Sequence, residues 1–452
     1  VQHQHTMKIV VVDPEGAHVP LDYESFREGV RISIPVAEPF RWRLVKVPFR
    51  LGHPWWIEDP ELDIDYHVRR ATAPAPGGRR ELAEVISMIA SIGLERDRPL
   101  WQAWMVDGLE GGRLAYVMKV HHSLADGLSS AQLLLDLLEE SPDSWPDPPP
   151  VEGLPRDDPP SRQWLVVDGL RHGAGIVGRL PRLMSDTARW GRATWGQKRE
   201  GRTLAPSFTT DKVRWNAPLT PHRWFAYDVV SLADMKRAKR SFGVTLNDVF
   251  LAMVAGGARR YLARRGELPA TDLTVSVPVS TRSEEQVREW GTRTTIWHVQ
   301  LPTTDPDPVS RLRTIAERTA TARRARDERG PRLQHDYMEA WPLWTLVVNW
   351  LPRPLRRLSP RASYSLIASN VPGPRRPLYA NGARVTGVIS MGPLVMDLGL
   401  NVTAWSYCDD FTIGVVACRE HVPDRWALMD DIVAELAELL AAQPVDADSN
   451  AG

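Results

Sequence analysis

Between Ser141 and Ser161 the sequence contains eight prolines among several acidic residues. Proline fixes φ and lacks an amide N–H, so this stretch forms neither a packed helix nor a central strand. It therefore divides the 452 residues into two parts, each close to the size of a common domain. We predict an N-terminal subdomain over 1–140, a proline-rich linker with a basic, tryptophan-bearing segment over 141–219, a C-terminal subdomain over 220–443, and a disordered tail over 444–452.

Both parts mix strand and helix patterns, which predicts an α/β fold with mixed sheets. In the first part the pattern predicts strands at 7–13, 40–50 and 62–69, a turn at 54–57, and a helix whose stripe starts at Leu82. A strand from Trp101 and a strand ending at the histidines form a predicted hairpin. In the second part Thr245 and Asp248 resemble a capping box at a helix start, and the remaining predicted elements are strands at 273–279, 364–369, 384–391, 398–407 and 411–418 and helices at 306–330 and 425–441.

The composition excludes several classes of protein. The 56 basic residues equal the 56 acidic ones, so no global field favours nucleic acid. Two cysteines, with no zinc-type spacing, predict neither a disulfide framework nor a metal site. No apolar run reaches the roughly 20 residues of a membrane span, and the start lacks a signal-peptide pattern. These features favour a cytoplasmic location and no bound cofactor.

A pair of histidines marks the end of a buried strand. The apolar run 114–120 leads into His121 and His122, and Asp126 and Gly127 precede a helical pattern. An imidazole with a pKa near 6.5 is suited to take a proton from a hydroxyl at neutral pH. The sequence has no Gly-x-Ser-x-Gly elbow for a serine nucleophile, so a histidine base would act on a substrate hydroxyl directly. Taken alone, the pair also fits a structural role, whereas no third ligand is spaced for a metal.

The motif His121-His122-x-x-x-Asp126-Gly127 resembles the HHxxxDG motif of the CoA-dependent acyltransferase superfamily, which includes chloramphenicol acetyltransferase and the condensation domains of peptide synthetases. Further stretches, in the expected order over about 5–442, are similar to the bacterial wax ester synthase/diacylglycerol acyltransferase family. They are Pro99-Leu100-Trp101, Asn247-Asp248, Pro278-Val279-Ser280-x-Arg282, Ser369-Asn370-Val371-Pro372-Gly373-Pro374, Pro377-Leu378-Tyr379, Gly399-Leu400-Asn401-Val402-Thr403 and Arg419-Glu420-His421-Val422-Pro423-Asp424.

This resemblance implies two chloramphenicol-acetyltransferase-like subdomains with a substrate tunnel between them. It implies acyl-CoA as co-substrate and diacylglycerol or a long-chain alcohol as acceptor, giving triacylglycerol or wax esters. The general base would be His122, and no acyl-enzyme would form. His121, Asp126 and Gly127 would shape the loop that presents His122.

The resemblance also suggests roles outside this loop. Asn401 and Thr403 are candidates for contacting the substrate and the oxyanion, and Asn370 is a candidate substrate contact. Asn247 with Asp248 fits either a helix cap or a substrate contact, with Asp248 the structural member. We also expect Arg282 to pair with Asp126.

Lipid acceptors raise the question of a membrane. Residues 340–361 combine an apolar, tryptophan-rich run with arginines, and 171–202 add basic and aromatic residues. Such content suits a bilayer interface, so we expect peripheral contact with the inner face of the membrane or with lipid droplets; a core helix with a basic end remains the alternative. Two other functions stay open: a condensation-type enzyme that uses another acceptor or a carrier-bound acyl donor, and a non-catalytic lipid-binding module.

Overall fold

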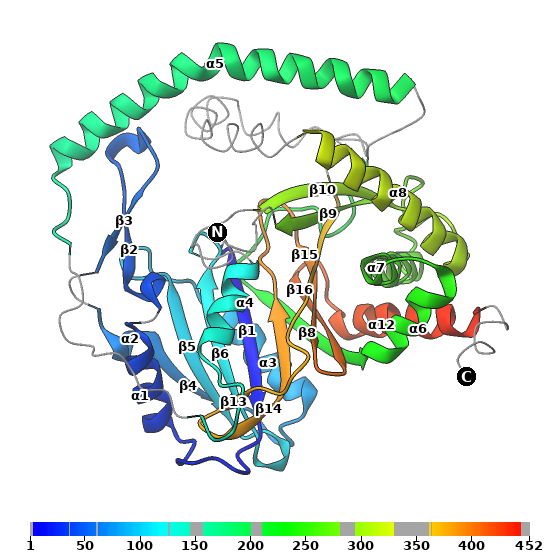
Figure 1. Ribbon diagram of the computed structural model, residues 1–452. Helices are drawn as coiled ribbons and strands as arrows, with labels where there is room; N and C mark the ends of the chain where they lie inside the picture. Colours follow the sequence, from blue (N-terminus) through cyan, green and yellow to red (C-terminus); the bar gives the residue numbers. More distant parts are fainter. Residues whose placement is uncertain are drawn as a thin grey trace.

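The computed structural model contains two twisted sheets with helices around them (Figure 1). The mixed α/β fold predicted from the sequence is therefore present. The described residues are 3–35, 37–59, 62–124, 127–144, 157–199, 210–280, 294–329, 361–362 and 364–443.

The first sheet has six strands in the order β13-β14-β1-β6-β5-β4. Its central strand β1 pairs antiparallel with β14 on one side and with β6 on the other. The predicted hairpin is formed by β5 and β6. The strand bounds are β1 His5–Val12, β4 Val68–Thr72, β5 Trp101–Asp107, β6 Leu114–His121, β13 Tyr379–Ala380 and β14 Ala383–Met391.

The second sheet also has six strands, in the order β10-β9-β12-β15-β16-β8. Strand β12 is parallel to both of its neighbours, and the other pairs are antiparallel. The bounds are β8 Arg223–Ser231, β9 Leu273–Ser280, β10 Thr294–Leu301, β12 Leu366–Val371, β15 Leu400–Tyr407 and β16 Asp410–Cys418. Two short ribbons pair β2 (Trp42–Val45) with β3 (Trp55–Glu58) and β7 (Thr210–Asp211) with β11 (Arg361–Ala362).

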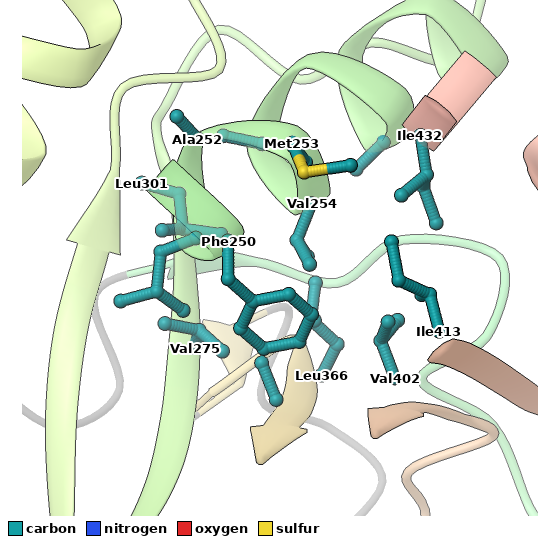
Figure 2. Close-up of a cluster of buried hydrophobic side chains, with 14 of the residues drawn as sticks. Phe250, Ala252, Met253, Val254, Val275, Leu301, Leu366, Val402, Ile413 and Ile432 are labelled. Atoms are coloured by element: carbon teal, nitrogen blue, oxygen red, sulfur yellow. The ribbon is translucent and has the colours of Figure 1, made fainter. Parts of the chain in front are cut away.

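Helices cover the sheets and complete the cores. The second core lies between α7 and α12 and the second sheet, where Phe250, Val402 and Ile432 meet (Figure 2). The helices are α1 Tyr23–Ser33, α2 Ile64–His67, α3 Arg79–Ser91, α4 Gly127–Asp136, α5 Arg162–Arg199, α6 Leu232–Phe242, α7 Leu246–Ala263, α8 Pro308–Arg329 and α12 Arg425–Ala441, with 3₁₀ turns η1 Glu38–Arg41, η2 Pro48–Arg50 and η3 Glu110–Gly112.

The two sheets share one apolar core. Met7 and Ile9 of the first sheet lie in the same cluster as Phe225 and Val416 of the second, with α3 beside them. Moreover, β14 joins the first sheet while the next strand, β15, joins the second. Two strands from the 220–443 segment thus complete the sheet that contains the histidines.

Three local predictions in the first half were wrong. The turn predicted at 54–57 is strand β3. The period-two pattern at 62–69 is a helical turn, α2, followed by β4, because the Asp63 side chain accepts from Tyr66 N and caps the turn. Only 42–45 of the strand predicted at 40–50 pairs as a strand, since Pro39 lies in the first turn of η1 and Pro48 begins η2 on the other side.

Most long elements match the prediction. Thr245 and Asp248 form the predicted capping box of α7, and Asp424 caps α12 as predicted. No single helix among the described residues is long and apolar enough to cross a membrane, although the bent pair α6–α7 meets that test by length and composition.

Candidate active site

The two histidines are held at the end of β6 by strands on both sides. His121 is the Cα partner of His5 on β1. The backbone N–H of His121 donates to Leu100 O at 2.9 Å, and that of His122 donates to Gln4 O at 2.9 Å. A turn follows, in which Leu124 N donates to His121 O. The backbone of both residues is therefore fixed by the sheet, which is a requirement for a pre-organised catalytic group.

The His121 imidazole is hydrogen-bonded to Ser123 in the turn that follows β6. Ser123 N donates to His121 Nδ1 at 3.2 Å, and Ser123 Oγ lies 2.8 Å from the same atom. Because Nδ1 accepts, the neutral ring carries its proton on Nε2. Burial, with Arg96 and His122 nearby, lowers the pKa of His121 to about 4. At neutral pH His121 is a neutral, weakly basic ring, which suits a positioning role better than proton abstraction.

Buried nitrogen groups surround His121 on the same side of the sheet. The His5 ring lies 6.5 Å from the His121 ring and stacks on His3 at 5.2 Å. Burial, followed by the charge of Lys119, lowers the pKa of His5 strongly. Lys119 donates to the carbonyls of Ile89 and Ile92 at the end of α3, and burial lowers its pKa to about 7.

These neighbours were not selected from the sequence. Two signals were available: the lysine within the apolar run 114–120, and the histidines at alternate positions, 3 and 5, just before the strand predicted at 7–13. Their meaning depends on the pairing of β1 with β6, which a single strand pattern does not reveal.

The second half brings Asn401 and Thr403 to the same end of the first sheet. Thr403 Oγ1 donates to Asn401 Oδ1 at 2.9 Å, and Asn401 Nδ2 donates to Pro393 O at 2.8 Å. Both side chains pack against Gly392, where an added Cβ would lie 2.6 Å from Asn401 Nδ2 and from Thr403 Oγ1. Gly392 lines a small cavity together with His5. Gly392 thus lies against Asn401 and Thr403 and also lines the cavity that contains His5, and Asn401 fixes the turn after β14 by its bond to Pro393 O.

The other candidates lie elsewhere in the second half. Asn370 is half-buried on β12 and pairs with Ala404 of β15. Asn247 is half-buried in the first turn of α7. Asp248 accepts from Thr245 N and, at 2.6 Å, from Thr319 Oγ1, so its carboxylate fixes α7 against α8. Asp248 therefore acts as a cap in this structure, while Asn247 and Asn370 keep their predicted roles as proposals.

Part of the predicted site is outside the described residues. Asp126, Arg282 and residues 340–360 of the tryptophan-rich segment lie there, and Gly127 is described only as the first residue of α4. The predicted pairing of Arg282 with Asp126 stays a prediction, as does the tunnel. Within the described ranges, no group of three or more His, Cys, Asp or Glu side chains is arranged to hold a metal ion.

Comparison with protein families identifies the chain. Residues 1–250 match the wax ester synthase/diacylglycerol acyltransferase catalytic domain, and residues 290–440 match the C-terminal domain of the same enzymes. The chain belongs to the wax ester synthase/diacylglycerol acyltransferase family. It is therefore an acyltransferase, and the family predicted from the ordered motifs is confirmed.

Relatives and solved structures agree with this family. A putative diacylglycerol O-acyltransferase of Mycobacterium tuberculosis H37Rv is 36% identical over 92% of this acyltransferase and 82% of the relative. A second, probable, diacylglycerol O-acyltransferase of that strain is 32% identical over 93% and 88%. The wax ester synthase/diacylglycerol acyltransferase of Marinobacter aquaeolei VT8 superposes with a TM-score of 0.69 at 28% identity, covering 97% of this chain and 94% of the other.

The fold extends to peptide-synthetase enzymes. The first condensation domain of the calcium-dependent antibiotic synthetase gives a TM-score of 0.60 at 19% identity, covering 98% of this chain and 92% of that domain. At this identity the likeness is one of fold. It agrees with the predicted chloramphenicol-acetyltransferase-like architecture of the family.

Proposed function

We propose that this acyltransferase transfers the acyl group of acyl-CoA to diacylglycerol, to a long-chain alcohol, or to both, with His122 as general base. The observation that carries the assignment is the fixed end of β6. Both histidine backbones are anchored there, and the His121 ring is held by Ser123 with its pKa lowered to about 4. His122 follows it, half-buried, at the point where the chain leaves the sheet. Of the two imidazoles, His122 is the one assigned to meet the substrate hydroxyl.

The proposed reaction needs no covalent enzyme intermediate. His122 accepts the proton of the acceptor hydroxyl as its oxygen attacks the thioester carbonyl. The tetrahedral intermediate then expels the CoA thiolate, which takes the proton back from the His122 imidazolium. The products are an ester and free CoA. Asn401 is the proposed donor near the developing oxyanion, since its amide has a second N–H besides the one that bonds Pro393 O. Thr403, whose hydroxyl donates to Asn401 Oδ1, would orient that amide.

The acceptors are lipids, so we also propose peripheral contact with the cytoplasmic face of a membrane or with lipid droplets. Acyl-CoA is proposed as the co-substrate, with no resident cofactor.

A substitution of His122 tests the mechanism. His122→Ala should lower kcat by about 10²–10⁴-fold, measured as transfer of radiolabelled palmitate from palmitoyl-CoA to diacylglycerol and to hexadecanol. His53→Ala, at an exposed histidine far along the chain, serves as the matched control and should keep wild-type turnover. Undiminished turnover by folded His122→Ala would refute the general base. A wild-type protein that uses only carrier-bound acyl groups would instead favour the condensation-type reaction.

A further inference from the structure

Helix α5 runs along the edge of the molecule (Figure 1), and its first half contacts η2 and Trp55 of β3. Leu165 and Ile176 are buried. Gly169 lies against η2, where an added Cβ would be 2.8 Å from the Cβ of Leu51. These residues define the side of the helix that faces the protein. The other sides of this 38-residue helix carry exposed side chains.

A second side of α5 is apolar and exposed. We call it the α5 apolar face, and it comprises Val167, Leu170, Val177, Leu180 and Met184, which are 37% to 71% exposed. At 3.6 residues per turn these five side chains fall within an arc of about 140°. Of the thirteen large hydrophobic residues exposed in the described part of the chain, six are on this helix. A helix normally buries such a stripe, and a contiguous exposed patch marks an interaction surface.

A third side of α5 is basic. Arg171, Arg179, Arg182 and Arg189 fall within an arc of about 80° that flanks the apolar face. The helix contains eight Lys and Arg residues against two Asp, a net charge of +6, while the whole chain is neutral. An anionic phospholipid layer has an apolar acyl region beneath negatively charged headgroups. An exposed apolar stripe can enter the acyl region while the basic residues beside it bind the headgroups.

Aromatic residues lie where α5 meets the ribbon β2–β3. Trp55 of β3 is 41% exposed, packs edge-on against Trp164 at 5.2 Å, and donates to Asp168 at 3.1 Å. Phe49 of η2 is 75% exposed. At 3.6 residues per turn, Trp164 and Asp168 fall within the arc of the arginines. Trp55 therefore packs on the basic side of α5 and not on the α5 apolar face.

We propose that the α5 apolar face is the surface by which this protein lies on an anionic phospholipid layer. The helix axis is parallel to the layer, the apolar face enters it, and the flanking arginines meet the phosphates. The inference deepens the proposed function, on which its biological purpose rests, because it assigns the lipid contact to α5.

Vesicle flotation tests the surface without any substrate. The full-length protein should float with phosphatidylcholine vesicles that contain 30% phosphatidylglycerol. The triple variant Leu170→Ser, Val177→Ser, Met184→Ser should lose binding by about tenfold or more, because each buried apolar side chain contributes separately. The matched control Met88→Ser, Val229→Ser, Ile296→Ser changes three similarly exposed residues and should bind like the wild type. Equal flotation of both variants, or no flotation of the wild type, overturns the proposal.

A fluorescent probe distinguishes other occupants. NBD attached to Val177→Cys in a Cys408→Ser background should shift to shorter wavelength when anionic vesicles are added, and NBD at Met88→Cys should not. A probe that is already shifted in buffer and unchanged by vesicles would show that protein covers the face, and the proposal would fail. In that case the molar mass from light scattering distinguishes two possible covers of the face. A dimer mass indicates a second copy of the chain, and a monomer mass indicates residues 330–360 of the same chain.

Activity separates this inference from the proposed function. The triple variant should retain wild-type turnover of palmitoyl-CoA with water-soluble dihexanoylglycerol and lose turnover of diacylglycerol held in vesicles. Absence of acyl transfer by the wild type, together with α5-dependent flotation, would refute the proposed function and leave the lipid surface supported. Loss of turnover by the triple variant with both acceptors would count against a purely lipid-docking role.

Discussion

At the scale of single residues, the state of the histidine cluster follows from burial. His5 and His121 are paired across β1 and β6, and Lys119 lies on the same side of the sheet. Charging an imidazole there would place it beside a buried amine with little water to solvate it. The folded protein therefore keeps these rings neutral, whereas the unfolded chain titrates them near pH 6.5.

The cluster should make the protein sensitive to acid. A lowered pKa in the folded state means that the unfolded chain binds more protons between the folded and unfolded pKa values. The stabilisation is fully present above about pH 6.5 and is lost as the pH falls toward the folded pKa of His121, about 4. We predict that His5→Gln reduces the fall in the free energy of unfolding between pH 6.5 and 4.5 by up to about 2 kcal/mol.

Urea unfolding at several pH values measures this effect. The exposed-site control His53→Gln should keep the wild-type pH dependence. An unchanged slope in His5→Gln would show that the His5 ring is protonated as readily in the folded protein as in the unfolded chain.

At the scale of elements, glycines in the middle of α7 explain how two helices approach closely. Gly256 and Gly257 interrupt the apolar pattern of the helix in the sequence. In the structure, a Cβ on Gly257 would lie 2.4 Å from Ile432 Cγ1 and 2.9 Å from Ile432 Cα of α12. The glycines therefore allow contact between backbones, at a cost in helix propensity.

We predict that Gly257→Ala lowers the free energy of unfolding by about 1–3 kcal/mol, because the added methyl has no space against α12. In an open helix the same change would raise stability by up to about 1 kcal/mol. Gly173→Ala on α5 is the control, since a Cβ there has nothing within 4 Å. Denaturant midpoints are measured by circular dichroism. The midpoint of Gly257→Ala should fall, and that of Gly173→Ala should rise or stay at the wild-type value. A stabilising Gly257→Ala would contradict the close packing.

At the scale of the whole molecule, the halves defined along the sequence are interleaved in space. β14 (383–391) supplies a neighbour to β1, and Thr6 Oγ1 donates to Met391 O at 3.0 Å. Lys8 reaches Ser390 at 2.6 Å and lies over the Trp405 ring. The sheet that positions the histidines is therefore completed by the second half.

We predict that residues 1–140 expressed alone do not form a stable domain, because β1 would become an exposed apolar edge without β14. Co-expression with residues 157–452 should restore a soluble complex. Thermal unfolding followed by circular dichroism measures both samples. A cooperative transition of the isolated 1–140 fragment would show that the boundary predicted from the sequence is also a boundary of folding.

Sequence patterns predicted what depends on neighbours along the chain. The capping box at Thr245, the hairpin β5–β6 and the long strands follow local propensity and period, and the structure contains them. The errors at 54–57 and 62–69 come from short segments, where a single cap or ribbon partner decides the conformation. The histidine pair was found because its motif is contiguous, while His5 was missed because its importance arises from strand pairing.

By itself, therefore, the sequence determined the family, the mixed α/β class and the position of the histidines at a strand end, since each is written in local residue order. Only the tertiary structure decided that β14 crosses into the first sheet, that Asn401 and Thr403 pack against Gly392, and that the α5 apolar face is exposed within the described part of the chain. These features depend on contacts between residues hundreds of positions apart, and the burial that fixes them exists only in the folded chain.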